Sequence, residues 1–152
     1  GMGAEFSSRC AIRSASPNAR FAWHFVHRGL VPATGAGSWL LPRLIGPQRA
    51  LRLLYTGEFL SAEEAHAIGY VDQLVASADL LPTALTIART IAAGSPFSQR
   101  RIKALVYEGL GAEVAQHMQR HTQALAECFK SNDHKEGVGA FLERRQANFT
   151  GT

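Results

Sequence analysis

Glu5 and the residues just before it form the first pattern that could do chemistry. Gly1-Met2-Gly3-Ala4 leads into a predicted helix, so the N–H groups of its first turn lack intrahelical acceptors. These groups and the helix dipole attract negative charge, which suits an oxyanion that develops during a reaction. Glu5 can accept and return a proton, although an acidic residue in a first turn also favours the helix dipole by itself. Both interpretations of Glu5 stay open.

Two further groups of residues are candidates for chemistry. His24 and His27 could act as acid or base, but they lie among aromatic residues, where a histidine is more often packed or exposed. Glu113, His117 and His121 recur at every fourth position, a spacing that can align metal ligands on one helix face. No further cluster of acids or thiols accompanies them, so we expect no metal.

Composition limits the class of protein. The chain has 152 residues, of which 46% are hydrophobic and 18% charged, as in a soluble globular domain. Its net charge of +4 suits an anionic partner such as a phosphate-bearing ligand. The basic residues are scattered and form no nucleic-acid-binding motif, so we expect no nucleic acid.

The cysteines and the apolar segments indicate the compartment. Cys10 and Cys128 lie far apart and form no CxxC motif, which favours free thiols in a reducing compartment. No signal peptide and no apolar run long enough to cross a membrane is visible. We therefore expect a cytoplasmic protein with no membrane partner.

The elements that must position these groups follow along residues 10–76. Short extended segments are expected near residues 11–15 and 21–23, and another at 70–75. A loop rich in proline and glycine, residues 32–39, precedes an apolar helix that we expect Ser38 to cap and Gly46 to end. A helix over 47–55 begins with proline, and one over 61–68 opens with a capping box, Ser61 with Glu64.

The remainder is predicted to be helical. Helices are expected over residues 78–93, from the break at 94–96 to 109, over 112–130, and over 133–147 with Asp133 as the cap. The sequence thus predicts a helix-rich α/β protein with two regions, a mixed region over 1–76 and a helical region over 77–152.

Three separated segments carry a family resemblance. Residues 28–46 read RGLVPATGAGSWLLPRLIG, and residues 47–75 read PQRALRLLYTGEFLSAEEAHAIGYVDQLV. The N-terminal segments GMGAE and CAIRSA, and the C-terminal segments SNDHKEG, AFLERR and NF, occur in the matching order. Together they resemble the crotonase superfamily, the enoyl-CoA hydratase/isomerase fold. The match covers the whole chain but only the C-terminal half of a typical member.

The resemblance implies a fold and a reaction. It implies the C-terminal half of a crotonase-like fold, with a helical region that packs subunits together. It implies hydration or isomerisation of an acyl-CoA thioester through a stabilised enolate, with coenzyme A as part of the substrate and no covalently bound cofactor. Met2 occupies the family position whose backbone N–H holds the thioester oxygen, and Glu5 that of the first catalytic glutamate. The family's second oxyanion donor belongs to the half that is absent.

The sequence departs from the family at the second acid. Hydratases place a glutamate where this chain has Phe25, and isomerase-like relatives place an acid where it has Ala33. The two-glutamate hydration mechanism therefore cannot operate unchanged. His24 and His27 are candidate substitutes.

The resemblance also implies substrate-binding positions. Pro32, Gly35 and Trp39 would border the acyl pocket, together with Phe25. Phe141 and Arg144 match positions that contact the adenine and phosphates of coenzyme A, often across a subunit interface, and a guanidinium suits phosphate. A solvated arginine in the last turn of a helix is the alternative for Arg144.

Three hypotheses for function follow. The first is an acyl-CoA enzyme, truncated and impaired in activity. The second is a non-catalytic oligomerisation or binding module that lacks the full oxyanion hole. The third is a half-site completed by another chain. Because a half-fold exposes apolar faces, we expect a homo-oligomer, by resemblance a trimer or a multiple of three.

Overall fold

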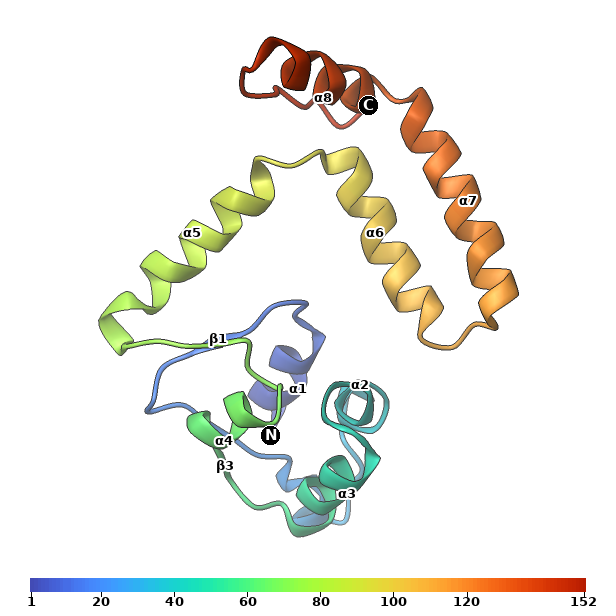
Figure 1. The fold of residues 1–152 in the computed structure, drawn as a ribbon. Helices are drawn as coiled ribbons and strands as arrows, with labels where there is room; N and C mark the ends of the chain where they lie inside the picture. Colours follow the sequence, from blue (N-terminus) through green and yellow to red (C-terminus); the bar gives the residue numbers. More distant parts are fainter. The chain divides into compact units, whose positions relative to one another are not determined.

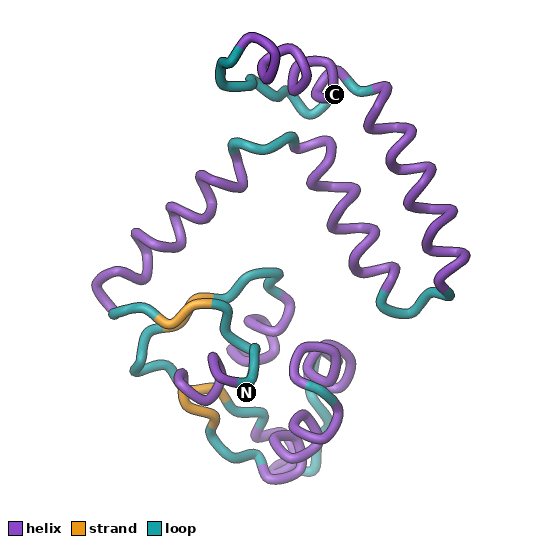
Figure 2. The backbone as a smooth tube through the Cα atoms, in the orientation of Figure 1, coloured by secondary structure: helices purple, strands orange, loops and turns teal.

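The chain forms two compact units, which a computed structural model describes over residues 1–152. The first unit is Gly1–Leu85 and the second is Thr86–Thr152. Helices dominate both units, and the short strands all lie in the first (Figure 2). This confirms the predicted helix-rich α/β class. The division at residue 76 that the sequence suggested stays a prediction.

The first unit contains four α-helices and four two-residue strands before α5 begins (Figure 1). Strand β1 pairs in parallel with β4, and β2 pairs antiparallel with β3. The elements in chain order are α1 (Met2–Arg9), β1 (Ser14–Ala15), β2 (Arg20–Phe21), the 3-10 helix η1 (His24–Arg28), α2 (Ala36–Ile45), α3 (Pro47–Thr56), β3 (Leu60–Ser61), α4 (Ala62–Ala67), β4 (Gln73–Leu74) and the 3-10 helix η2 (Ser77–Asp79).

Tyr70 lies at the centre of this unit and fixes α1 in place. Its ring packs edge-on against Trp23, with centroids 5.5 Å apart, and both side chains are fully buried. Its hydroxyl bonds to the Ser7 hydroxyl at 2.7 Å, to the Ser8 hydroxyl at 3.0 Å and to the Ala4 carbonyl at 3.1 Å. Burial raises the pKa of Tyr70, against smaller opposing effects of the two serine hydroxyls. Because one phenol contacts two successive turns of α1, the position of α1 depends on the core.

Local signals in the sequence define most helix ends. The capping box is confirmed: the Ser61 hydroxyl accepts from the Glu64 N–H, and the Glu64 carboxylate accepts from the Ser61 N–H. Gly46 ends α2, as expected. The expected extended segment over 70–75 shrinks to β4, because the N–H groups of Tyr70 and Val71 both bond to the carbonyl of Ala65 and close the end of α4.

The expected cap of α2 was wrong. The helix begins two residues before Ser38, with Gly35 as its N-cap at φ 74°. The Ser38 hydroxyl donates to the carbonyl of Gly35 from inside the first turn, at 3.2 Å. A positive φ at the cap position explains why a glycine occupies it.

The second unit is a helical assembly. Helix α5 (Leu80–Ala92) runs from the first unit into the second, followed by α6 (Pro96–Gly109), α7 (Val114–Lys130) and α8 (Asn132–Glu143). Helix α7 packs against both α6 and α8. Many apolar side chains on these helices are exposed, including Val114 at 77% and Phe141 at 81%.

Asp133 does not cap α8, contrary to the expectation from sequence. Ser131 is the cap, since its hydroxyl accepts from the His134 N–H at 3.0 Å. Asp133 is buried and accepts from the Ser95 hydroxyl at 2.6 Å and from the N–H groups of Thr150 and Gly151, each at 2.9 Å. Burial opposes its charge, but these bonds together hold its pKa below the usual range. Asp133 therefore joins the start of α6 to the C-terminal tail.

Helix α8 ends at Glu143 rather than at residue 147, because Arg144 turns into the left-handed region at φ 54°. Arg145 then reaches back to Glu136 with two bonds of 2.6 and 2.9 Å. Glu136 also accepts from the Asn148 N–H at 2.7 Å. The bond from Arg145 and then the bond from Asn148 lower the pKa of Glu136 to about 2.

We expect Glu136→Gln to lower the melting temperature at pH 7. We also expect the melting temperature of this variant to depend less on pH than that of the wild type. A carboxylate whose pKa is lowered in the folded state stabilises fully above its unfolded pKa near 4.5, and this stabilisation is lost as pH falls through about 2. The melting temperature, followed by circular dichroism at pH 7 and at pH 3, should differ less in Glu136→Gln than in the wild type. The exposed Glu113→Gln is the matched control. An unchanged pH dependence in Glu136→Gln would contradict the assignment.

Candidate functional site

The N-terminus of α1 opens onto a hollow of about 330 Å³. The N–H groups of Met2 and Gly3 have no acceptor in the chain, because Ala4 and Glu5 are the first helix residues to donate, both to the Gly1 carbonyl. The lining residues come from α1, β2, η1 and the turn before β3: Gly1, Gly3, Ala4, Ser7, Arg20, Phe21, Ala22, His24 and Phe59. Two free donors at the positive end of a helix form a small anion-stabilising group.

Glu5 is fully buried and points to the loop before α2 rather than into this hollow. Its Oε2 accepts from the Thr34 N–H at 3.1 Å and from the Thr34 hydroxyl at 2.6 Å, and its Oε1 accepts from the Gly37 N–H at 2.8 Å. Gly37 is in the first turn of α2, so the carboxylate lies at the positive end of that helix. Oε1 keeps one acceptor position unused. The first contribution of Glu5 is therefore to connect α1 to α2.

The loop around Pro32 and Gly35 closes tightly on Glu5. The Gly35 N–H donates to the Pro32 carbonyl at 3.2 Å, which turns the chain into α2. A Cβ on Gly37 would lie 2.6 Å from Glu5 Oε1 and 2.9 Å from Pro32 Cβ, so no side chain fits there without displacement. The structure thus places Pro32 and Gly37 close to Glu5. Neither Pro32 nor Gly35 lines the hollow at α1, and their assignment to an acyl pocket stays a prediction.

Phe25 and Trp39 lie on either side of this loop in the sequence but in different environments. Phe25 is half-buried in η1 and packs against the core of the first unit. Trp39 is 47% exposed on α2, and the Arg43 guanidinium lies 4.2 Å from its ring centroid. Neither side chain lines the hollow at α1.

Phe141 and Arg144 belong to the second unit. Phe141 is 81% exposed near the end of α8, and Arg144 is the exposed residue that ends this helix. The Arg144 N–H donates to the Phe141 carbonyl at 3.3 Å, so the two predicted ligand-binding residues are adjacent within this unit.

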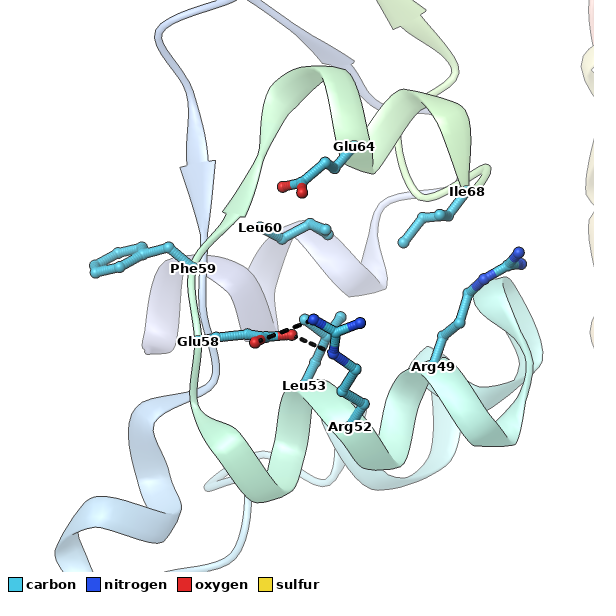
Figure 3. A pocket seen from close by; sticks show the side chains of 8 residues that line it. All are labelled: Arg49, Arg52, Leu53, Glu58, Phe59, Leu60, Glu64 and Ile68. Atoms are coloured by element: carbon cyan, nitrogen blue, oxygen red, sulfur yellow. Dashed lines mark hydrogen bonds and ion pairs between the residues drawn. The ribbon is translucent and has the colours of Figure 1, made fainter.

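A second hollow of about 250 Å³ lies between α3, β3 and α4 (Figure 3). Arg52 reaches across it to Glu58, with Nε 2.8 Å from the carboxylate (Figure 3). The Glu64 carboxylate is committed to the capping box, and the bonds from Ser61 lower its pKa. These groups satisfy one another or the backbone.

The remaining candidates in the sequence form no site. His117 and His121 lie near each other on α7, with ring centroids 6.4 Å apart, but no group of three or more histidine, cysteine or acidic side chains is arranged to hold a metal ion. No helix is both long and apolar enough to cross a membrane.

The roles of Thr34 and Tyr70 were not predicted from the sequence. Thr34 donates twice to Glu5, and Tyr70 anchors α1 with its hydroxyl. The position of Thr34 directly before Gly35, the N-cap of α2, could have indicated its role. A threonine there offers both a hydroxyl and a backbone N–H as donors near the start of the helix. No local signal identifies Tyr70, because its partners lie more than 60 residues away.

Comparison with known proteins gives consistent matches. The family model described as enoyl-CoA hydratase/isomerase matches residues 1–152. A crotonyl-CoA hydratase of Syntrophomonas wolfei is 40% identical over 149 residues, which cover 98% of this chain and 57% of that protein. A 1,2-epoxyphenylacetyl-CoA isomerase of Escherichia coli is 38% identical over 153 residues, with 99% and 57% covered.

Solved structures agree on the fold. The crystal structure of an enoyl-CoA hydratase from Bacillus anthracis superposes with a TM-score of 0.95 at 34% identity and covers 100% of this chain and 58% of that one. The chain thus spans a little over half the length of the relatives that it matches.

Proposed function

The chain belongs to the enoyl-CoA hydratase/isomerase family, and on that basis we propose that its first unit binds acyl-CoA thioesters with the carbonyl oxygen at the N-terminus of α1. The observation that carries the proposal is the pair of free N–H groups at Met2 and Gly3 in the first turn of α1, of which Gly3 lines the hollow. An enolate places negative charge on the thioester oxygen. These donors and the positive end of α1 therefore stabilise the enolate more than the neutral thioester.

The acids that are present limit the reaction. Phe25 and Ala33 cannot exchange protons, so a hydration that needs two carboxylates has only Glu5. Removal and return of one α-proton through an enolate needs a single acid–base group and fits the residues present better. We assign Glu5 to holding the loop before α2 against α1, since its carboxylate is fully buried there and lies outside the hollow.

The second unit is assigned to assembly and to the coenzyme A moiety. Phe141 offers an exposed ring and Arg144 a guanidinium, groups that suit an adenine and a phosphate. A non-catalytic oligomerisation module is the second candidate function. The exposed apolar side chains of α7 and α8 favour it, among them Val114, Phe141 and Leu142.

The exposed apolar side chains support a partner for either function. We propose that other copies of this chain or a separate chain cover them. Sedimentation across micromolar concentrations should show an oligomer, by family resemblance a trimer or a multiple of three. A well-behaved monomer would contradict this.

Calorimetric titration of crotonyl-CoA and of free coenzyme A tests the proposed binding. We expect crotonyl-CoA to bind more tightly than coenzyme A, because only the thioester presents a carbonyl oxygen to the Met2 and Gly3 donors. Hydration is followed in parallel by the loss of enoyl absorbance. If neither compound binds at millimolar concentration, the acyl-CoA proposal is wrong. Binding without any turnover favours the non-catalytic alternative.

A further inference from the structure

The hollow at the N-terminus of α1 contains one side chain that can act as a general base. That side chain is His24, which η1 contributes. Among the other lining side chains, the Arg20 guanidinium offers only donors, and the Ser7 hydroxyl is engaged with Tyr70 and the Ala4 carbonyl. The others are glycines, alanines and phenylalanines. His24 is therefore the lining side chain that can accept a proton from a ligand, whereas the Gly1 nitrogen, which also lines the hollow, donates to the Ala22 carbonyl.

Packing holds the His24 ring while leaving its nitrogens unpaired. The ring is half-buried and lies edge-on to Phe59, with centroids 4.7 Å apart. The Arg20 guanidinium lies over the same phenylalanine ring at 3.9 Å and so fixes Phe59 from another side. Gly57 supplies the space next to the imidazole, because a Cβ there would lie 3.4 Å from Nδ1 of His24. No hydrogen bond from His24 to the rest of the chain competes with a ligand.

The two other candidates for a base are placed differently. Glu5 is buried against the loop at Thr34 and Gly37 and does not line the hollow. His27 is exposed on the same 3-10 helix, lies against Gly57, and is also outside the lining. His24 thus combines an imidazole that makes no hydrogen bond within the chain with a place in the hollow that Gly3 also lines.

We propose that His24 is the base that removes the α-proton of a bound acyl-CoA thioester. The inference rests on the proposed function. The α-C–H bond breaks, the proton passes to the neutral imidazole, and the electron pair moves onto the thioester oxygen as an enolate. The N–H groups of Met2 and Gly3 hold that oxygen. The imidazolium then returns a proton to the carbon, so the step balances without a further reactant.

Deuterium exchange measures this step directly. Butyryl-CoA is incubated with the protein in D₂O, and deuterium at the α-carbon is followed by mass spectrometry. We expect His24→Gln to slow exchange by ~10²-fold or more, the usual contribution of a positioned acid–base group. His27→Gln, the matched control on the same 3-10 helix, should exchange like the wild type. Calorimetry should show that His24→Gln still binds butyryl-CoA.

The outcomes separate the inference from the function on which it rests. Exchange at the wild-type rate in His24→Gln would overturn the inference while leaving thioester binding intact. Binding of butyryl-CoA by the wild type without exchange would also overturn it. If the wild type does not bind the thioester at all, the proposed function fails and the role of His24 fails with it.

Discussion

Replacing Glu5 with alanine is expected to lower the free energy of unfolding by about 3 kcal/mol, since each buried donor left unpaired costs about 1–3 kcal/mol. The substitution removes the acceptor for the Thr34 N–H, the Thr34 hydroxyl and the Gly37 N–H at a fully buried position. Urea unfolding followed by circular dichroism gives the measurement.

Two further variants make the Glu5 result specific. Glu5→Gln keeps the shape of the side chain but directs an NH₂ group at one of the donors, so we expect an intermediate loss of about 1–2 kcal/mol. Glu63→Ala removes an exposed glutamate from the first turn of α4 and should change stability by less than about 0.5 kcal/mol. If Glu5→Ala is as stable as Glu63→Ala, Glu5 does not connect α1 to α2.

Gly37→Ala is expected to destabilise the protein by about 1–2 kcal/mol, since overpacking costs about 1–3 kcal/mol and alanine recovers up to about 1 kcal/mol of helix propensity. Its Cβ would lie 2.6 Å from Glu5 Oε1 and 2.9 Å from Pro32 Cβ. The same unfolding experiment measures the effect.

Gly3→Ala is the control for Gly37→Ala because it also lies in the first turns of a helix, but its Cβ would meet nothing within 4 Å. It should stabilise by up to about 1 kcal/mol, so the two substitutions should differ in sign. In the Glu5→Ala background the cost of Gly37→Ala should shrink, because one of its two clashes is removed. Equal effects of both glycine substitutions would contradict the close packing of the loop.

Sequence patterns predict the elements whose ends depend on neighbouring residues. The capping box at Ser61 and Glu64 and the glycine at the end of α2 are local, and both are confirmed. The start of helix α8 could not be predicted from local sequence alone, because Ser131 and Asp133 are both good N-caps by residue type. Which one caps is decided by Asp133 bonding to Ser95 and to the C-terminal tail. Such long-range bonds leave no periodic signal in the sequence.

The candidate site also contains one feature that could be predicted from the sequence and others that could not. The free N–H group of Met2 follows from the start of a helix and could be predicted from sequence. The orientation of Glu5 toward Thr34 could not, because it depends on how the loop of residues 32–37 folds back across α1. His24 was one of two equivalent candidates in the sequence. Only the structure distinguishes His24 from His27, because His24 lines the hollow and His27 does not.

The central claim is that the N-terminus of α1 receives the thioester oxygen, and removal of the Met2 N–H tests it most directly. Met2→Pro deletes this donor, and proline is well accepted at the first position of a helix. Met2→Ala keeps the donor and controls for the side chain. The ligand is acetoacetyl-CoA, a thioester that readily forms an enolate, and its affinity is measured by calorimetry.

We expect Met2→Pro to weaken the binding of acetoacetyl-CoA by ~10–100-fold, because a hydrogen bond to a charged oxygen contributes about 1.5–3 kcal/mol. Met2→Ala should bind like the wild type, and free coenzyme A should not distinguish the three proteins. Equal affinity of Met2→Pro and the wild type for acetoacetyl-CoA would contradict the claim that this helix terminus holds the thioester oxygen.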